Sequence, residues 1–193
     1  MKDVQLKGEF KELFKHRPFL INLLILIIAW ITSSFDWYLI GFQLDNIGGS
    51  IFINTYISAA SDLIVTLLSG IIYYYIGIKL SFIILFLISG VGGIINMVVQ
   101  TDNDYGIALM LLIAKFGVGG TFTLVFLSIA HLYPSVLATT TFGICNVCAR
   151  MATIAAPLVA ELDKVYSNLI FTILAISSAI LCLFIIEPKK NDW

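Results

Sequence analysis

Six apolar stretches constrain what this chain can fold into more than any other feature of its sequence. A helix needs about 20 apolar residues to cross the hydrocarbon core of a bilayer. The chain has 193 residues, and its six stretches are residues 19–42, 51–73, 80–99, 106–130, 136–160 and 167–186. Backbone polar groups in lipid must bond within the protein, and apolar runs of this length do so as helices. The sequence therefore predicts an all-α membrane protein with six transmembrane helices.

The composition agrees with burial in lipid. Hydrophobic residues make up 60% of the chain and charged residues 12%, whereas soluble domains carry about 25% charged residues. The net charge is −1, and no basic patch with interleaved aromatic residues occurs, so membrane lipid is the expected partner and nucleic acid is not. We expect a juxtamembrane segment at residues 1–18, a helical bundle at residues 19–187 and a tail at residues 188–193.

The basic residues outside the spans predict an orientation. Positively charged residues are concentrated in cytoplasmic connections. With the N-terminus on that side, the residues there are Lys2, Lys7, Lys11, Lys15, Arg17, Lys79, Lys189 and Lys190. The opposite side then holds only Lys164. Both termini are thus expected on the cytoplasmic side of a membrane, or on the matrix side of an organelle, and the sequence does not say which membrane.

Four of the six spans contain one ionisable residue each: Asp36, Asp62, Lys115 and Arg150. A charge near the bilayer centre costs roughly 2.5–3.5 kcal/mol on insertion scales, so such residues normally face a bundle interior or a water-filled path. Two acids balance two bases here. We therefore expect these four helices to share a polar interior, with the third and sixth spans packed outside it.

Helical periodicity supports a polar face on these spans. In the second span the polar positions recur at steps of three and four residues: Asn54, Ser58, Ser61, Asp62, Thr66 and Ser69. In the fifth span the same pattern comprises Thr139, Gly143, Asn146, Arg150, Thr153 and Pro157. Small and hydroxyl residues also allow helices to pack closely in lipid. Because each stripe includes a charge, we prefer a polar cavity to close packing alone.

An ordered series of motifs resembles a known family. The segments are Glu12 to Lys15, Asn46 to Phe52, Lys115-Phe116-Gly117, Ala130-His131-Leu132-Tyr133-Pro134-Ser135, and Gly143 to Val159. Together they are similar to the C-terminal six-helix half of a major facilitator superfamily transporter of the organic cation/organic anion transporter family. The resemblance runs from about residue 10 to residue 190 and implies half of that fold. In this family, the helices matching the first, second, fourth and fifth spans line the substrate path.

The resemblance also implies candidate site residues. Family members that carry anions tend to have arginine where Arg150 stands, although a second basic position of that branch falls on Thr66. The substrate-path candidates are Arg150, Lys115, Asp62, Asp36, Tyr38, Asn146, Phe122 and Phe126. Each has a structural alternative. Arg150 could pair with Asp36 or Asp62, and Lys115 could snorkel toward the membrane surface. Asp62 and Asp36 could hold the two bases in place or take part in proton coupling, and Asp62 could also join helices. The aromatic rings could be core.

The sequence departs from the family where the charges of the inner gate are expected. The family's Asp-Arg-x-Gly-Arg-Arg reads Tyr74-Tyr75-Ile76-Gly77-Ile78-Lys79 here. The acid before Leu132-Tyr133-Pro134 is replaced by His131, and a basic residue after it by Ala138. A complete transporter also has two six-helix halves with its site between them. Only the second half is represented here.

Three interpretations follow from these observations. The chain is half of a secondary transporter, completed by an N-terminal half or by a second copy of itself. Alternatively, it is a degenerate transporter half kept as a structural subunit of a larger membrane complex. It could also be a fragment of a longer protein. No enzyme, cofactor or metal site is predicted, because the sequence contains no nucleophile–base pair, metal cluster or phosphate loop. The pair Cys145 and Cys148 lies within an apolar span and fits close helix packing better than redox or metal chemistry.

Overall fold

The computed structural model describes residues 10–43, 51–99 and 104–187, and every regular element in these ranges is a helix. The helices are α1 (Phe10–Lys15), α2 (Arg17–Gln43), α3 (Ile51–Val98), α4 (Asp104–Leu132), α5 (Ser135–Thr153), α6 (Ala156–Ala160) and α7 (Lys164–Cys182). The prediction of an all-α protein is confirmed. Most of the expected segment 1–18, the tail 188–193 and parts of two connections, 44–50 and 100–103, lie outside the described residues.

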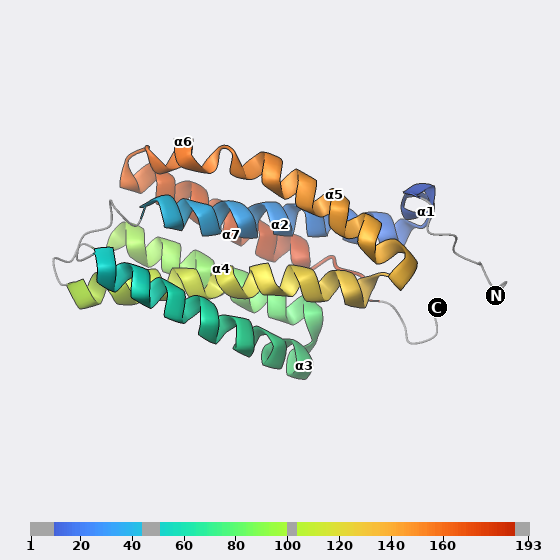
Figure 1. Cartoon of the computed structure of the whole chain (residues 1–193), viewed down its shortest axis with the longest axis horizontal. Coiled ribbons are helices and arrows are strands. Elements are labelled where there is room, and N and C mark those ends of the chain that lie inside the picture. Colours follow the sequence, from blue (N-terminus) through green and yellow to red (C-terminus); the bar gives the residue numbers. More distant parts are fainter. Residues whose placement is uncertain (1–9, 44–50, 100–103, 188–193) are drawn as a thin grey trace.

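The described chain crosses the bundle six times, as predicted. Five helical segments are long and apolar enough to span a membrane: α2, α3, α4, α5 together with α6, and α7. Helix α3 accounts for two crossings, because Gly77 interrupts it with φ 79° and ψ 169°. This conformation is accessible essentially only to glycine. Gly77 thus separates a first arm, residues 51–76, from a second arm, residues 78–98, and the two arms form a hairpin (Figure 1).

Helix α4 lies against both arms of α3, and glycines make this contact close. A Cβ atom added to Gly92 on the second arm would lie 2.6 Å from the backbone of Ala114 on α4. A Cβ on Gly117 of α4 would collide with the backbone of Leu85 and Ser89. Small residues of this kind let helices in lipid approach closely and gain van der Waals contact. In Figure 1, α3 and α4 lie on one side of the molecule, and α2, α5 and α6 lie on the other.

The fifth span was expected to be one helix over residues 136–160, but the structure divides it. Helix α5 ends at Thr153, and α6 begins at Ala156 with Pro157 in its first turn. Proline has no N–H group, and its ring clashes with the carbonyl four residues earlier, which here is that of Thr153. The break therefore follows from the position of Pro157.

At each end of the bundle, side-chain hydrogen bonds connect α2 to the chain at one end of α7. The amide nitrogen of Asn22 donates to the carbonyl of Ile186 at 2.8 Å, and the Ile186 N–H donates back at 2.9 Å. The start of α2 thus lies beside the end of α7, as six crossings require; we call this end the Asn22 end. At the opposite end, which we call the Gln43 end, the Gln43 amide donates to the hydroxyl of Ser167.

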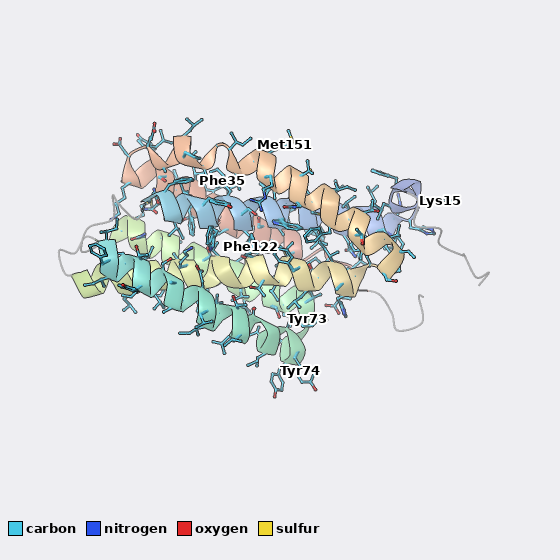
Figure 2. All side chains as sticks on the ribbon, viewed as in Figure 1. Lys15, Phe35, Tyr73, Tyr74, Phe122 and Met151 are labelled. Atoms are coloured by element: carbon cyan, nitrogen blue, oxygen red, sulfur yellow. The ribbon has the colours of Figure 1, made fainter. Side chains whose placement is uncertain are left out.

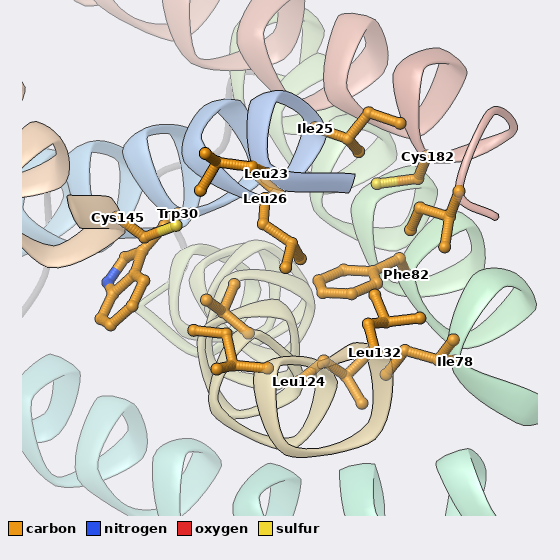
Figure 3. Packing of buried hydrophobic residues seen from close by; sticks show 14 of the residues in the cluster. Leu23, Ile25, Leu26, Trp30, Ile78, Phe82, Leu124, Leu132, Cys145 and Cys182 are labelled. Carbon is orange, nitrogen blue, oxygen red and sulfur yellow. The ribbon is translucent and has the colours of Figure 1, made fainter. Parts of the chain in front are cut away.

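The connection between α4 and α5 is fixed at the Asn22 end by Tyr133. This residue lies outside the spans, and its hydroxyl donates to the carbonyl of Phe19 at 2.8 Å. Burial raises the pKa of Tyr133, so the phenol keeps its proton and remains a donor. Deeper in the bundle, apolar side chains from α2, α3, α4, α5 and α7 pack together, among them Leu26, Phe82 and Leu124 (Figure 3).

Candidate functional site

A cavity of about 150 Å3 lies between α2, α4 and α5. Its lining residues are Trp30, Ser34, Tyr38, Phe122, Phe126, Phe142, Asn146, Arg150 and Thr153. Five of the eight substrate-path candidates lie in this lining, namely Tyr38, Phe122, Phe126, Asn146 and Arg150. The other three, Asp36, Asp62 and Lys115, lie elsewhere in the bundle.

Sequence reasoning missed three lining residues, Trp30, Ser34 and Phe142, whereas Thr153 was already placed on the polar stripe of the fifth span. Residues four and eight apart on a helix lie on one face. Trp30 and Ser34 precede Tyr38 by eight and four residues, so the spacing was available in the sequence. Phe142 has the same relation to Arg150. The missed residues could have been found because each lies on the same helix face as a residue already chosen as a candidate, Tyr38 or Arg150.

Aromatic rings form one wall of the cavity. The centroid of the Trp30 ring lies 5.1 Å from that of Phe126 and 5.1 Å from that of Phe142, both in edge-on geometry. Phe122 extends the group, with its centroid 5.4 Å from that of Phe126. Edge-on pairs of this kind are worth about 0.5–1.5 kcal/mol beyond the area that they bury. The wall is apolar and can hold a flat or aliphatic group.

Arg150 supplies the charge of the cavity. Its Nη1 donates to the Tyr38 hydroxyl at 3.4 Å. Within the described residues Arg150 forms no ion pair, so it pairs with neither Asp36 nor Asp62. A guanidinium presents donors in a planar fork that matches a carboxylate or a sulfate. The arrangement combines an unneutralised cation with an aromatic wall.

Lys115 lies outside the cavity and is neutralised. Its ammonium is 3.4 Å from a carboxylate oxygen of Asp62 on the first arm of α3 and 4.0 Å from the centre of the Trp37 ring. Lys115 is 2% exposed, so it does not snorkel out of the bundle. The pair joins α4 to α3 and leaves Arg150 as the unpaired base among the two predicted in the spans.

Asp36 is the most buried of the eight candidates, at 1% exposure. Its Oδ1 has no hydrogen-bond partner among the described residues. It lies two residues from Tyr38 on α2, but it is not among the residues that line the cavity. The expected balance of two acids and two bases is therefore realised in only one pair, Asp62 with Lys115.

The polar stripe of the second span mostly packs against other helices. Asn54, Ser58, Ser61 and Ser69 are buried, and Gly119 of α4 lies against Val65 and Asp62. The first arm of α3 supplies no lining residue to the cavity. For this stripe, the alternative of close helix packing describes the geometry better than a shared cavity. Three of the four charge-bearing spans, and not all four, meet at the cavity.

Helix α5 is largely uncovered. Only 17% of the most apolar part of Ser135–Ala160 is buried, compared with 61% for Arg17–Gln43. One exposed face is polar and contains Thr139, Gly143 and Arg150. A second exposed face is apolar and contains Met151, which projects from the edge of the molecule in Figure 2. The apolar face suits lipid, whereas a face bearing Arg150 does not.

The Asn22 end has a tyrosine–histidine contact where the family resemblance leads one to expect acidic and basic residues. The Tyr73 hydroxyl and Nδ1 of His131 are 2.9 Å apart and hydrogen-bonded. The neighbouring Tyr74 and Tyr75 are 80% and 78% exposed, and Figure 2 shows Tyr74 pointing away from the bundle. The first arm of α3 and the end of α4 are thus connected without an ion pair between these residues.

The fold and the cavity together define a class: a multi-pass, all-helical integral membrane protein built as one six-span half of a major facilitator type bundle. The comparisons with known proteins identify its relatives. Rat organic anion transporter 3 is 30% identical over 86% of this chain, Xenopus laevis solute carrier family 22 member 6-A is 29% identical over 86%, and human organic cation/carnitine transporter 2 is 26% identical over 83%. The resemblance to the organic cation and organic anion transporters is confirmed.

The match covers much less of the relatives than of this chain. The chain spans about a third of their length: 32% of the rat protein, 30% of the Xenopus protein and 29% of the human protein. No protein-family profile matches the sequence. Two of the three relatives are named as transporters and the third as a solute carrier, and none of the three names describes an enzyme.

Proposed function

We propose that this chain forms one half of a secondary transporter for small organic ions. The observation that carries the proposal is Arg150: an unpaired cation, on an uncovered helix face, at the edge of an aromatic cavity. A charge in this position needs a polar partner at membrane depth. A transported organic anion would provide this partner each time it binds to Arg150. Both termini would lie on the cytoplasmic or matrix side, with residues 19–187 forming the bundle.

The cavity size supports the need for a second half. Sites for drug-sized ligands occupy roughly 300–1,000 Å3, whereas this cavity has about 150 Å3. The chain alone therefore offers one wall of a site. In transporters built from repeats, the site lies between the two repeats, near the bilayer midplane. A partner half, from another chain or a second copy, would cover the polar face of α5 and complete the site.

The charge balance favours an anionic substrate. Asp62 neutralises Lys115, so Arg150 gives the cavity its positive charge. Its planar fork would bind a carboxylate or a sulfate, and the Trp30, Phe126 and Phe142 rings would contact the rest of the molecule. Some relatives are named for anions and others for a cation and carnitine, so the preference is taken from Arg150 and not from the names.

Flux measurements in liposomes test this proposal. The chain is reconstituted alone and with the N-terminal half of an organic anion transporter, and uptake of a labelled aromatic carboxylate is measured. We expect uptake with the partner half, loss in Arg150→Ala, partial retention in Arg150→Lys and no change in the exposed Lys164→Ala. Absence of uptake of any organic ion in either preparation contradicts the proposal.

A second candidate function is a structural subunit of a larger membrane complex. The Tyr73–His131 contact and the exposed Tyr74 and Tyr75 favour it, because the acidic and basic residues that form the inner gate in the family are replaced here. Under this alternative, the uncovered face of α5 binds partner helices permanently. Purification from the native membrane in fixed stoichiometry with a large assembly, whose activity survives Arg150→Ala, would select it over transport.

A further inference from the structure

Asp36 is an acid buried in the bundle without a base. It is 1% exposed, and its Oδ1 lacks a hydrogen-bond partner among the described residues. Burying an isolated carboxylate is so unfavourable that the group normally becomes neutral instead. The cavity described above does not use this residue. Its position therefore needs a separate explanation.

The hydrogen bonds one turn earlier show which way Asp36 faces. The Thr32 hydroxyl is bonded to that of Ser178 on α7 at 2.7 Å, and the Ser33 hydroxyl to that of Thr121 on α4 at 3.0 Å. Residues three and four apart share a helix face, so Asp36 lies on the same side of α2 as these two hydroxyls. It faces the seam between α4 and α7. The cavity residues Ser34 and Tyr38 lie on a different side of the helix.

Within the part of the seam that the structure describes, no charge is available to Asp36. Residues 167–181 of α7, residues 80–98 of α3 and Ala156–Ala160 of α6 contain no titratable side chain. On α4 the nearby base is Lys115, whose ammonium is engaged by Asp62 and by the Trp37 ring. On α5, Arg150 bonds to Tyr38 on the cavity side. A proton is the remaining cation that can neutralise the carboxylate.

We propose that Asp36 is a proton-binding site, which holds a proton as a neutral carboxylic acid while α2 packs against α4 and α7. The bound species is a single proton, taken up by the carboxylate as the seam closes. The proton leaves when the seam opens and water reaches the group. Helix α2 carries both Asp36 and the cavity residue Tyr38, so a movement of this helix would alter the seam and the cavity together. The proposal goes beyond the proposed function, since it requires no organic substrate.

Infrared spectroscopy of the full chain in lipid nanodiscs tests the inference. A protonated carboxyl has a C=O stretching band that a carboxylate lacks, and the band shifts in D2O. At pH 7, roughly three units above the ordinary pKa of aspartate, we expect this band in the unaltered chain. It should be lost in Asp36→Asn and unchanged in Asp163→Asn, which removes an exposed acid. A missing band, or one that survives Asp36→Asn, overturns the proposal.

A second variant covers the case in which Asp36→Asn does not fold. Asp36→Glu keeps the acid but alters its position, so the band should remain at a shifted frequency. A band that stays at its original frequency in this variant contradicts the assignment. Circular dichroism verifies helix content in each sample. Since no flux is measured, a chain that shows the band but carries no substrate retains this inference and fails only the proposed function.

Discussion

At the scale of single residues, the two bases of the spans have opposite surroundings. Lys115 is 2% exposed and held by Asp62 at 3.4 Å, whereas Arg150 is exposed and its guanidinium bonds only to the Tyr38 hydroxyl among the described residues. A buried ion pair adds little net stability, but removal of one partner is costly because the other charge stays buried. The Lys115–Asp62 pair therefore fixes α4 against α3, and the Arg150 guanidinium is the base that remains available to bind an anion.

The Lys115–Asp62 pair can be tested by removing its acid. Asp62→Asn leaves the Lys115 ammonium buried without a counter-ion, and we expect the free energy of unfolding to fall by about 3 kcal/mol. Unfolding in mixed micelles with increasing detergent denaturant measures the loss. The double variant Asp62→Leu with Lys115→Met should recover most of the stability, because it removes both charges. Equal destabilisation in the single and double variants would show that charge is not the cause.

Tyr133 illustrates a residue whose role is structural despite its place in a family motif. Its hydroxyl donates to the Phe19 carbonyl, which fixes the α4–α5 connection against the start of α2. Tyr133→Phe should lower the free energy of unfolding by about 0.5–1.5 kcal/mol, the usual net worth of one hydrogen bond. Tyr166→Phe, at an exposed site on α7, is the matched control and should change nothing. A loss confined to transport, with stability intact, would argue against the structural role.

At the scale of elements, the contact of α4 with α3 depends on the absence of side chains. Gly92 and Gly117 bring the second arm close enough to α4 that an added Cβ would meet backbone atoms. Backbone cannot move aside as the end of a side chain can, so the helices would have to separate. The same hairpin depends on Gly77, because its φ of 79° is strained for other residues.

Substitution at Gly92 tests the close contact. Gly92→Ala should destabilise the chain by about 1–3 kcal/mol, the usual cost of overpacking, because the new Cβ lies 2.6 Å from the Ala114 backbone. Thermal unfolding followed by circular dichroism measures the change. Gly143→Ala is the control, since no atom lies within 4 Å of a Cβ at that site and alanine favours the helix. Similar losses in both variants would exclude a packing effect.

The sequence predicts the spans well and their mutual rotation poorly. Span length and hydropathy determine that six helices form, because lipid allows no other structure for these residues. The pairing of Lys115 with Asp62 could not be predicted, since it depends on how α4 turns relative to α3 and on glycine contacts distant in sequence. Asp36, expected to balance a base, faces a seam whose nearby base, Lys115, is already paired with Asp62. Trp30 and Phe142 were missed although their spacing from Tyr38 and Arg150 places them on the cavity face.

At the scale of the whole molecule, the bundle is closed on most sides and open along α5. Its span is the least buried of those that could cross the membrane, at 17%. The exposed polar positions Thr139 and Gly143 continue the face that carries Arg150. In lipid, an uncovered face with a guanidinium is unfavourable. The isolated chain is thus expected to be incomplete, and the missing cover should lie against α5.

Cysteine labelling tests this expectation. In a chain whose three cysteines are replaced by alanine, Thr139→Cys should react readily with a maleimide when the chain is alone and be protected when a partner half is present. Ile173→Cys on the exposed apolar side of α7 should give the same yield in both samples. Labelling yields measured by mass spectrometry decide the matter. Undiminished reaction at Thr139→Cys in the assembled protein would place the partner elsewhere.

The Gly77 connection has a consequence for how the chain is made. A single non-helical residue separates the two arms of α3, so the described chain has no loop between them that could remain on one side of the membrane after the first arm had inserted. We therefore expect that the first arm does not insert into lipid as an independent span, because the second arm follows it directly. The two arms should therefore pass from the translocon into the membrane together, as a preformed helical hairpin. The second arm would then determine the orientation of the first arm across the membrane.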